Sequence, residues 1–150
     1  MEKGDLAASE PEPQAFVVYE GLVAVAGPKF TQNRFARRIR MHRYRAALDL
    51  LAYNEAALMA LWNLWMASRP VCLITYLPPE MMPAIQQHLD EHGVPHLRTL
   101  HVTETGMART IAMRRDAAMV FDADPDRALM YGPKGRIIPP EHAAAMEKFL

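Results

Sequence analysis

Polar side chains that could bind a phosphate group and a metal ion stand at the ends of apolar, β-prone runs in this sequence. Glu20, Thr75 and Asp122 each occupy such a position, and Asp124 and Asp126 follow Asp122 closely. A hydroxyl group beside a helix N-terminus favours an anion, and hard carboxylate oxygens favour Mg²⁺. These residue types therefore predict a phosphate-and-magnesium site.

The side chains meet only if the β-prone runs form one sheet. Strands are predicted at 16–19, 22–26, 71–76, 97–102, 117–121 and 136–138, and helices at 31–67, 78–92, 104–115, 124–130 and 141–150. This alternation favours an α/β fold of three layers, a Rossmann-like parallel sheet with helices on both faces. Ligands of such sheets bind beyond the carboxyl ends of the strands. We expect the strand at 16–19 to be central and to lie beside 118–122.

The longest helical pattern, 31–67, contains neither proline nor glycine. Its apolar residues share one broad face, which includes Phe35, Leu61 and Trp65. Because 37 residues is long for one helix, a break is expected near 44–49 or 53–54.

Composition predicts one ordinary folded domain. The chain has 150 residues, of which 51% are hydrophobic and 23% charged. Its 17 basic and 17 acidic side chains balance, so no net charge attracts nucleic acid or a membrane. With a single cysteine and neither a signal sequence nor a membrane-spanning apolar run, we expect a soluble, cytoplasmic protein. Residues 1–14 read as an acidic, flexible tail, and 15–150 as the domain.

In order and spacing, the strand ends resemble the motifs of the haloacid dehalogenase (HAD) superfamily of Rossmann-like phosphohydrolases. The resemblance covers about residues 15–138 and is to small forms with little or no cap, as found in actinobacteria and their phages. It implies that Thr75 and Arg109 bind phosphate and that Asp122 and Asp126, which have the D-x-x-x-D spacing of the family, bind Mg²⁺.

The first motif departs from the family pattern Asp-x-Asp-Gly. Aligning Glu20 and Gly21 with the final Asp-Gly places Val18 at the position of the nucleophilic aspartate. Valine has no oxygen with which to attack phosphorus or bind a metal. Glu20 then occupies the acid/base position of a degenerate catalytic site, and any Mg²⁺ binding should be weak.

Each candidate also has a structural interpretation. Asp124 followed by proline is typical of a helix N-cap, Thr75 is a β-former, and Glu20 suits a solvated turn. The histidines at 88 and 92 have the i, i+4 spacing of a metal pair, but without a third ligand a solvated helix face is the simpler interpretation.

An arginine-rich segment offers a second kind of site. Arg34, Arg37, Arg38 and Arg45 gather opposite the apolar face of the predicted helix, and residues 29–45 contain no acidic side chain. The pattern is that of a solvated helix face, of a surface that tracks a phosphate backbone, or of a contact for an acidic protein surface such as residues 1–14 of another copy.

Three functions follow from these alternatives. The first is a HAD-like domain that has lost catalysis and serves as a binding or interaction module, with a protein partner or a second copy as its ligand. The second is a Mg²⁺-dependent phosphatase that uses another nucleophile. The third is a nucleic-acid-associated protein that binds through residues 34–45.

Overall fold

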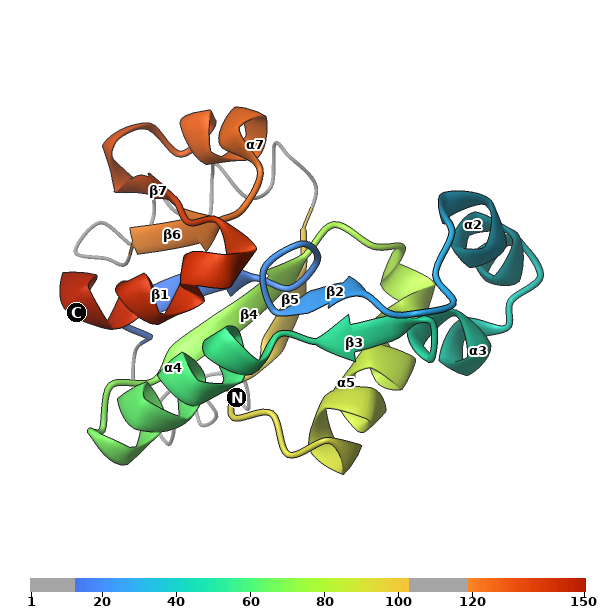
Figure 1. Ribbon diagram of the computed structural model, residues 1–150, viewed down its shortest axis with the longest axis horizontal. Helices are drawn as coiled ribbons and strands as arrows, with labels where there is room; N and C mark the ends of the chain where they lie inside the picture. Colours follow the sequence, from blue (N-terminus) through green and yellow to red (C-terminus); the bar gives the residue numbers. More distant parts are fainter. Residues whose placement is uncertain (1–12, 103–118) are drawn as a thin grey trace, which may run out of the picture.

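The computed structural model describes residues 13–102 and 119–150. They form a five-stranded sheet with helices packed against it (Figure 1). The strand order is β5-β4-β1-β6-β7, and every neighbouring pair is parallel. The strands are β1 (Ala15–Val18), β4 (Val71–Thr75), β5 (Thr99–His101), β6 (Met119–Asp122) and β7 (Gly135–Ile137). The predicted α/β class is confirmed, as is the central position of the first strand beside β6.

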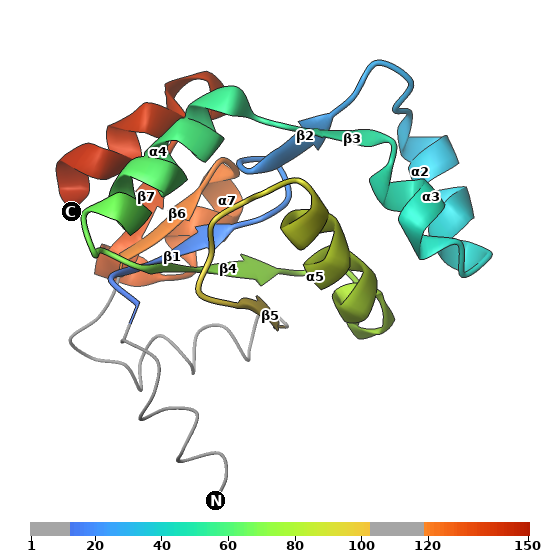
Figure 2. The same ribbon diagram turned by 90° about the horizontal axis from the view of Figure 1, so that it is seen from below.

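A two-stranded antiparallel sheet carries a helical insertion. Strands β2 (Ala24–Ala26) and β3 (Leu51–Tyr53) pair with each other, and α2 (Gln32–Arg40) and α3 (Tyr44–Leu48) lie between them in sequence. Figures 1 and 2 show α2 and α3 together at one end of the molecule, with β2 and β3 leading to them. We call residues 27–50, which link β2 to β3 and contain α2 and α3, the helical insertion.

The helical stretch predicted over 31–67 is interrupted at the expected position 53–54, but also at 41–43 and by a strand, neither of which was predicted. Residue His42 has a φ of 59°, a left-handed conformation that a helix cannot continue through, and α2 ends just before it. A strand, β3, then precedes α4 (Glu55–Met66), whose first turn is capped by the side chain of Asn54. Three residues of strand give almost no periodic signal, and β3 is stabilised by its pairing with β2.

The other predicted elements in the described ranges are confirmed. They are η1 (Pro79–Met81), α5 (Met82–Glu91), α7 (Pro125–Leu129) and η3 (Pro140–Phe149). A short turn of helix that was not predicted, η2 (Gly132–Lys134), follows α7. Gly93, with a φ of 66°, follows the end of α5, where the sequence requires a left-handed residue. The predicted helix at 104–115 and nearly all of the predicted tail at 1–14 lie outside the described residues.

Alternate residues of β1 contribute to two hydrophobic clusters, one on each face of the sheet. Ala15 and Val17 pack in the larger cluster, which includes residues of α4, α5 and η3. Phe16 and Val18 belong to the smaller cluster with Cys72, Ile74, Val120 and Tyr131. Figure 2 shows α4 and η3 side by side over one face of the sheet. Burial of β1 on both faces fixes the register that brings the strand ends together.

Within the described ranges, no helix combines the length and the apolar character that crossing a membrane requires.

We expect Leu73→Ala to lower the free energy of unfolding by about 2–5 kcal/mol, the usual cost of a cavity at a buried leucine. Leu73 is fully buried in the middle of β4. The matched control is Leu129→Ala, because Leu129 is 75% exposed and should change stability by less than about 0.5 kcal/mol. Urea denaturation followed by circular dichroism measures both, and equal losses would contradict this assignment of the core.

Candidate functional site

The sheet topology brings the carboxyl ends of β1, β4 and β6 to one edge. Because β1 lies between β4 and β6 and all three are parallel, Glu20, Thr75 and Asp122 meet there. Gly21, directly after Glu20, has a φ of 93°, so the chain can turn sharply out of the sheet. We call Glu20, Thr75, Asp122 and the side chains that contact them the strand-end site.

Glu20 is bound to the end of β4 through both carboxylate oxygens. The hydroxyl group of Thr75 donates a hydrogen bond of 2.9 Å to Oε1, and the amide of Tyr76 donates one of 2.9 Å to Oε2. The same hydroxyl accepts a bond of 3.1 Å from the amide of Leu77. Burial raises the pKa of Glu20, although these donors and the charge of Arg127 offset part of the rise. Glu20 is thus no solvated turn residue, and Thr75 binds a carboxylate.

Asp122 is fully buried and forms a two-point ion pair with Arg127. The guanidinium Nε lies 3.0 Å from Oδ2 and the guanidinium Nη2 lies 3.0 Å from Oδ1. The amide of Asp124 donates a further hydrogen bond of 2.9 Å to Oδ1. Burial raises the pKa of Asp122, while that amide and the guanidinium of Arg127 act to lower it. The cation beside this buried carboxylate is therefore part of the chain itself.

Arg127 also reaches the end of β1. Its Nη2 donates a hydrogen bond of 3.2 Å to the main-chain oxygen of Glu20, and its guanidinium carbon lies 5.2 Å from the ring centroid of Tyr76. One side chain of α7 thus contacts the ends of three strands. Arg127 was not among the site residues predicted from the sequence. A signal for it exists, because Arg127 lies in the first turn of a helix that begins just after Asp122, so its side chain can reach back to that carboxylate.

The other predicted carboxylates have different surroundings. Asp124 caps α7, because its side chain accepts hydrogen bonds from the amides of Asp126 and Arg127. The side chain of Asp126 is exposed. Across the described ranges, no group of three carboxylate, imidazole or thiol side chains is placed to hold a metal ion.

Two further predicted positions concern phosphate chemistry. Val18, which was predicted to replace a nucleophilic aspartate, is fully buried in the smaller cluster and pairs with Ile74 of β4. Arg109, the predicted phosphate ligand, lies outside the described residues.

A hollow of about 450 Å³ opens beside Glu20, between the strand ends and the helical insertion. Its walls are mostly apolar and include Val25, Phe30, Phe35 and Leu77, with Glu20 as the charged group. A hollow of this composition can bind a small apolar group, and its described lining residues include no cation for a phosphate.

The four arginines predicted to share one helix face are divided by the break at His42. Arg34 and Arg37 are exposed on α2, whereas Arg38 donates a hydrogen bond of 2.7 Å to the carbonyl of Ala46. Arg45, on α3, forms a two-point ion pair with Glu91 of α5, with its shorter contact at 2.7 Å. Arg45 therefore attaches the helical insertion to α5.

The predicted solvated face around His88 is wrong. His88 is 3% exposed, its Nδ1 lies 2.6 Å from the hydroxyl oxygen of Tyr53, and its Nε2 lies 3.4 Å from a carboxylate oxygen of Asp49. The ring of His92 packs on His88 with 4.3 Å between centroids. Burial lowers the pKa of His88. These contacts make His88 a packing residue between α5 and the insertion.

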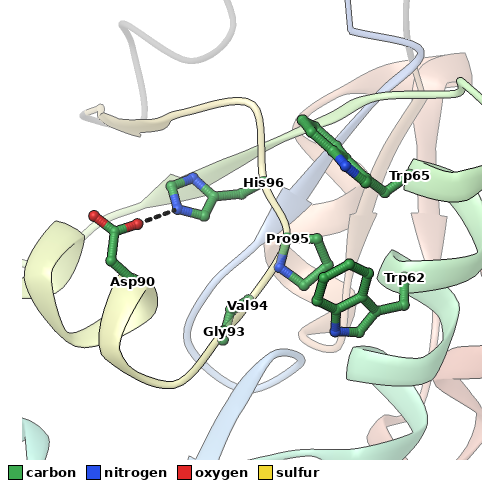
Figure 3. A pocket seen from close by; sticks show the side chains of 7 residues that line it. All are labelled: Trp62, Trp65, Asp90, Gly93, Val94, Pro95 and His96. Carbon is green, nitrogen blue, oxygen red and sulfur yellow. Dashed lines mark ion pairs between the residues drawn. The ribbon is translucent and has the colours of Figure 1, made fainter.

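Figure 3 shows a second hollow, of about 280 Å³, between α4 and the loop that follows α5. Trp62 and Trp65 lie on one side of it, and Pro95 belongs to the loop and faces Trp62. On the other side, Nε2 of His96 lies 3.6 Å from a carboxylate oxygen of Asp90. The indoles are 46% and 45% exposed, so the prediction that Trp65 belongs to the core face of its helix is wrong.

Comparison with known proteins adds no relative. Neither a protein-family model, nor a curated protein, nor a solved structure matches the chain.

We expect Arg127→Leu to lower the free energy of unfolding by about 3–5 kcal/mol, because it leaves the charge of Asp122 buried without its partner. Adding Asp122→Asn should recover a large part of that loss, since the unpaired charge is then removed. Chemical denaturation of the two single variants and the double variant, as a double-mutant cycle, measures the coupling.

Arg40→Leu is the control for this cycle, because Arg40 is an exposed arginine of α2. It should change stability by less than about 0.5 kcal/mol. A similar loss in Arg127→Leu and Arg40→Leu, or strictly additive effects of the pair, would contradict the ion pair described above.

Glu20→Gln should gain stability relative to the wild type as pH rises. Because burial raises the folded-state pKa of Glu20, its contribution to stability is fully present below the unfolded-state pKa. That contribution is lost as pH rises through the folded-state pKa, and glutamine has no such titration. Urea unfolding at intervals between about pH 4 and pH 8 measures the difference.

Glu91→Gln should show the opposite trend. The guanidinium of Arg45 lowers the pKa of Glu91, so this pair stabilises the fold above the unfolded-state pKa and the benefit is lost as pH falls. Glu91→Gln should therefore lose stability relative to the wild type as pH rises. Parallel trends in the two variants would show that Glu20 is not desolvated.

Proposed function

We propose that this chain is a HAD-like domain without the catalytic nucleophile, and that it acts as a binding module. The resemblance in sequence aligns Val18 with the nucleophilic aspartate of the family and implies a phosphate site at Thr75 and Mg²⁺ at Asp122 and Asp126. The strand order supports the comparison, because β1 lies between the strands that end in Thr75 and Asp122.

The observation that carries the proposal is the ion pair of Arg127 with Asp122. Both oxygens of this carboxylate already bind a guanidinium, so Mg²⁺ at Asp122 has to displace Arg127 and lose its two charge-assisted hydrogen bonds. The site balances the buried charge with a protein cation. Mg²⁺ binding, if it occurs through Asp122 and Asp126, should therefore be weak.

Two further features leave the strand-end site without the groups that hydrolysis needs. Val18 offers no oxygen for attack on phosphorus, and no covalent aspartyl-phosphate can form there. Thr75 donates its hydroxyl proton to Glu20, and Glu20 accepts a second bond from the amide of Tyr76, so neither side chain is free to orient a substrate. A phosphate bound at this edge would gain ground-state affinity but little rate.

The binding role then falls to surfaces around the sheet. Of the four arginines of the predicted partner contact, Arg34 and Arg37 are exposed, whereas Arg38 is half-buried and Arg45 is paired with Glu91. An acidic partner, either another protein or a second copy, suits this face by charge.

The wild-type protein is expected to release no phosphate from an aryl phosphate above the rate of Asp122→Asn, with or without millimolar Mg²⁺. Calorimetric titration of Mg²⁺ should show weak binding that disappears in Asp122→Asn. Turnover that depends on Mg²⁺ and is abolished by Asp122→Asn would overturn the proposal and favour a phosphatase with another nucleophile. Tight Mg²⁺ binding that survives the substitution would contradict the assignment of Asp122 as a ligand.

A further inference from the structure

A third hollow, of about 430 Å³, lies within the helical insertion, and three of its six described lining residues are cationic. Its lining residues are Pro28, Lys29, Arg34, Arg38, Asp49 and Leu50. Three positive side chains thus face one carboxylate. This hollow, the cationic hollow, is separate from the strand-end site in every lining residue.

Both guanidinium groups of the cationic hollow are oriented by main-chain oxygens. Arg34 Nη1 donates a hydrogen bond of 2.7 Å to the carbonyl of Lys29, and Arg38 Nη1 donates one of 2.7 Å to the carbonyl of Ala46. A carbonyl restricts the side chain without neutralising it, so each guanidinium keeps its charge and its remaining N–H donors. The two groups are therefore preorganised, which lowers the entropy that a ligand must overcome.

The positive charge of this hollow is only partly balanced by the chain. Residues 29–45 contain no acidic side chain, and the ion pair of Arg45 with Glu91 lies outside the hollow's lining. Asp49, the one carboxylate in the lining, also lies 3.4 Å from Nε2 of His88. Arg34 and Arg38 are four residues apart on α2, where like charges repel each other. A bound anion would relieve that repulsion.

We infer that the cationic hollow binds the phosphate group of a small phosphorylated molecule. Arginine and lysine side chains that converge on a confined space bind phosphate oxygens through charge-assisted hydrogen bonds. A nucleic-acid strand fits less well, because the lining contains no aromatic ring on which a base could stack. The inference goes beyond the proposed function, because it assigns a small phosphorylated ligand to a hollow outside the strand-end site.

The test is binding of orthophosphate, pyrophosphate and a sugar phosphate by calorimetry and thermal unfolding, against sodium chloride at equal ionic strength. The phosphates should raise the melting temperature where chloride does not. Arg34→Gln and Arg38→Gln together should weaken pyrophosphate binding by about tenfold or more, as expected for the loss of two charge-assisted contacts.

Two single variants make the result specific to the hollow. Lys29→Gln removes a lining charge but leaves the main-chain oxygen that holds Arg34, so it tests the charge without disturbing the fold. Arg37→Gln is the matched control, because Arg37 is exposed on the same helix but does not line the hollow. Lys29→Gln should weaken binding. Arg37→Gln should change the binding constant by less than about twofold, because salt screens the effect of an exposed charge that does not contact the ligand.

Two outcomes would overturn the inference. Equal stabilisation by phosphate and chloride would show only screening of charge. Binding of a single-stranded oligonucleotide that weakens equally in Lys29→Gln and Arg37→Gln would show a polyanion surface instead of a hollow. Because phosphate release at the strand-end site is measured separately with Asp122→Asn, hydrolysis there would defeat the proposed function and leave binding at the cationic hollow intact.

Discussion

The buried charge of Asp122 is the constraint around which the strand-end site is organised. Burying a carboxylate at the end of β6 costs free energy unless a cation binds it. Arg127 supplies that cation from the next helix, and the same guanidinium bonds to the main chain of Glu20 and lies near the ring of Tyr76. The ends of β1, β4 and β6 are thereby held together by one side chain.

This solution has a chemical consequence. A metal ion at the same position would be exchangeable and could polarise a ligand, whereas a guanidinium tethered to α7 cannot leave without exposing a buried charge. Glu20 is likewise bound by groups of the chain itself, because its two oxygens accept hydrogen bonds from Thr75 and from the amide of Tyr76. The polar groups at this edge satisfy one another, which favours a structural role for them and accords with the proposed loss of catalysis.

The helical insertion has the opposite balance. Its arginines outnumber the acidic groups around them, and only Arg45 is neutralised by a close ion pair, with Glu91 of α5, among the side chains the structure describes there. The buried contact of His88 with Tyr53 and Asp49 attaches the same insertion to α5. The insertion is thus attached to α5 on one side, while excess positive charge remains around the cationic hollow.

Local sequence patterns sufficed to predict much of the fold. Apolar β-prone runs predicted the strands of the sheet, and Asp124 before proline and the glycine at 93 predicted where α7 begins and α5 ends. Such signals are local: period-two or continuous apolar runs, N-caps and left-handed residues act within a few positions of themselves. The alternation of strands and helices then restricted the topology enough to place the first strand at the centre.

Other features depended on tertiary contacts. The break at His42 has no glycine or proline to signal it, and β3 is only three residues long and depends on β2. Burial of His88 against Tyr53 and exposure of Trp65 follow from how α5 and α4 pack, which a helical period alone does not determine. The sequence by itself determined that carboxylates and a threonine would gather at one edge of a sheet. Only the tertiary structure showed that the guanidinium of Arg127, which pairs with nearby Asp122, also reaches the main chain of Glu20, because that contact joins residues 107 positions apart in the sequence.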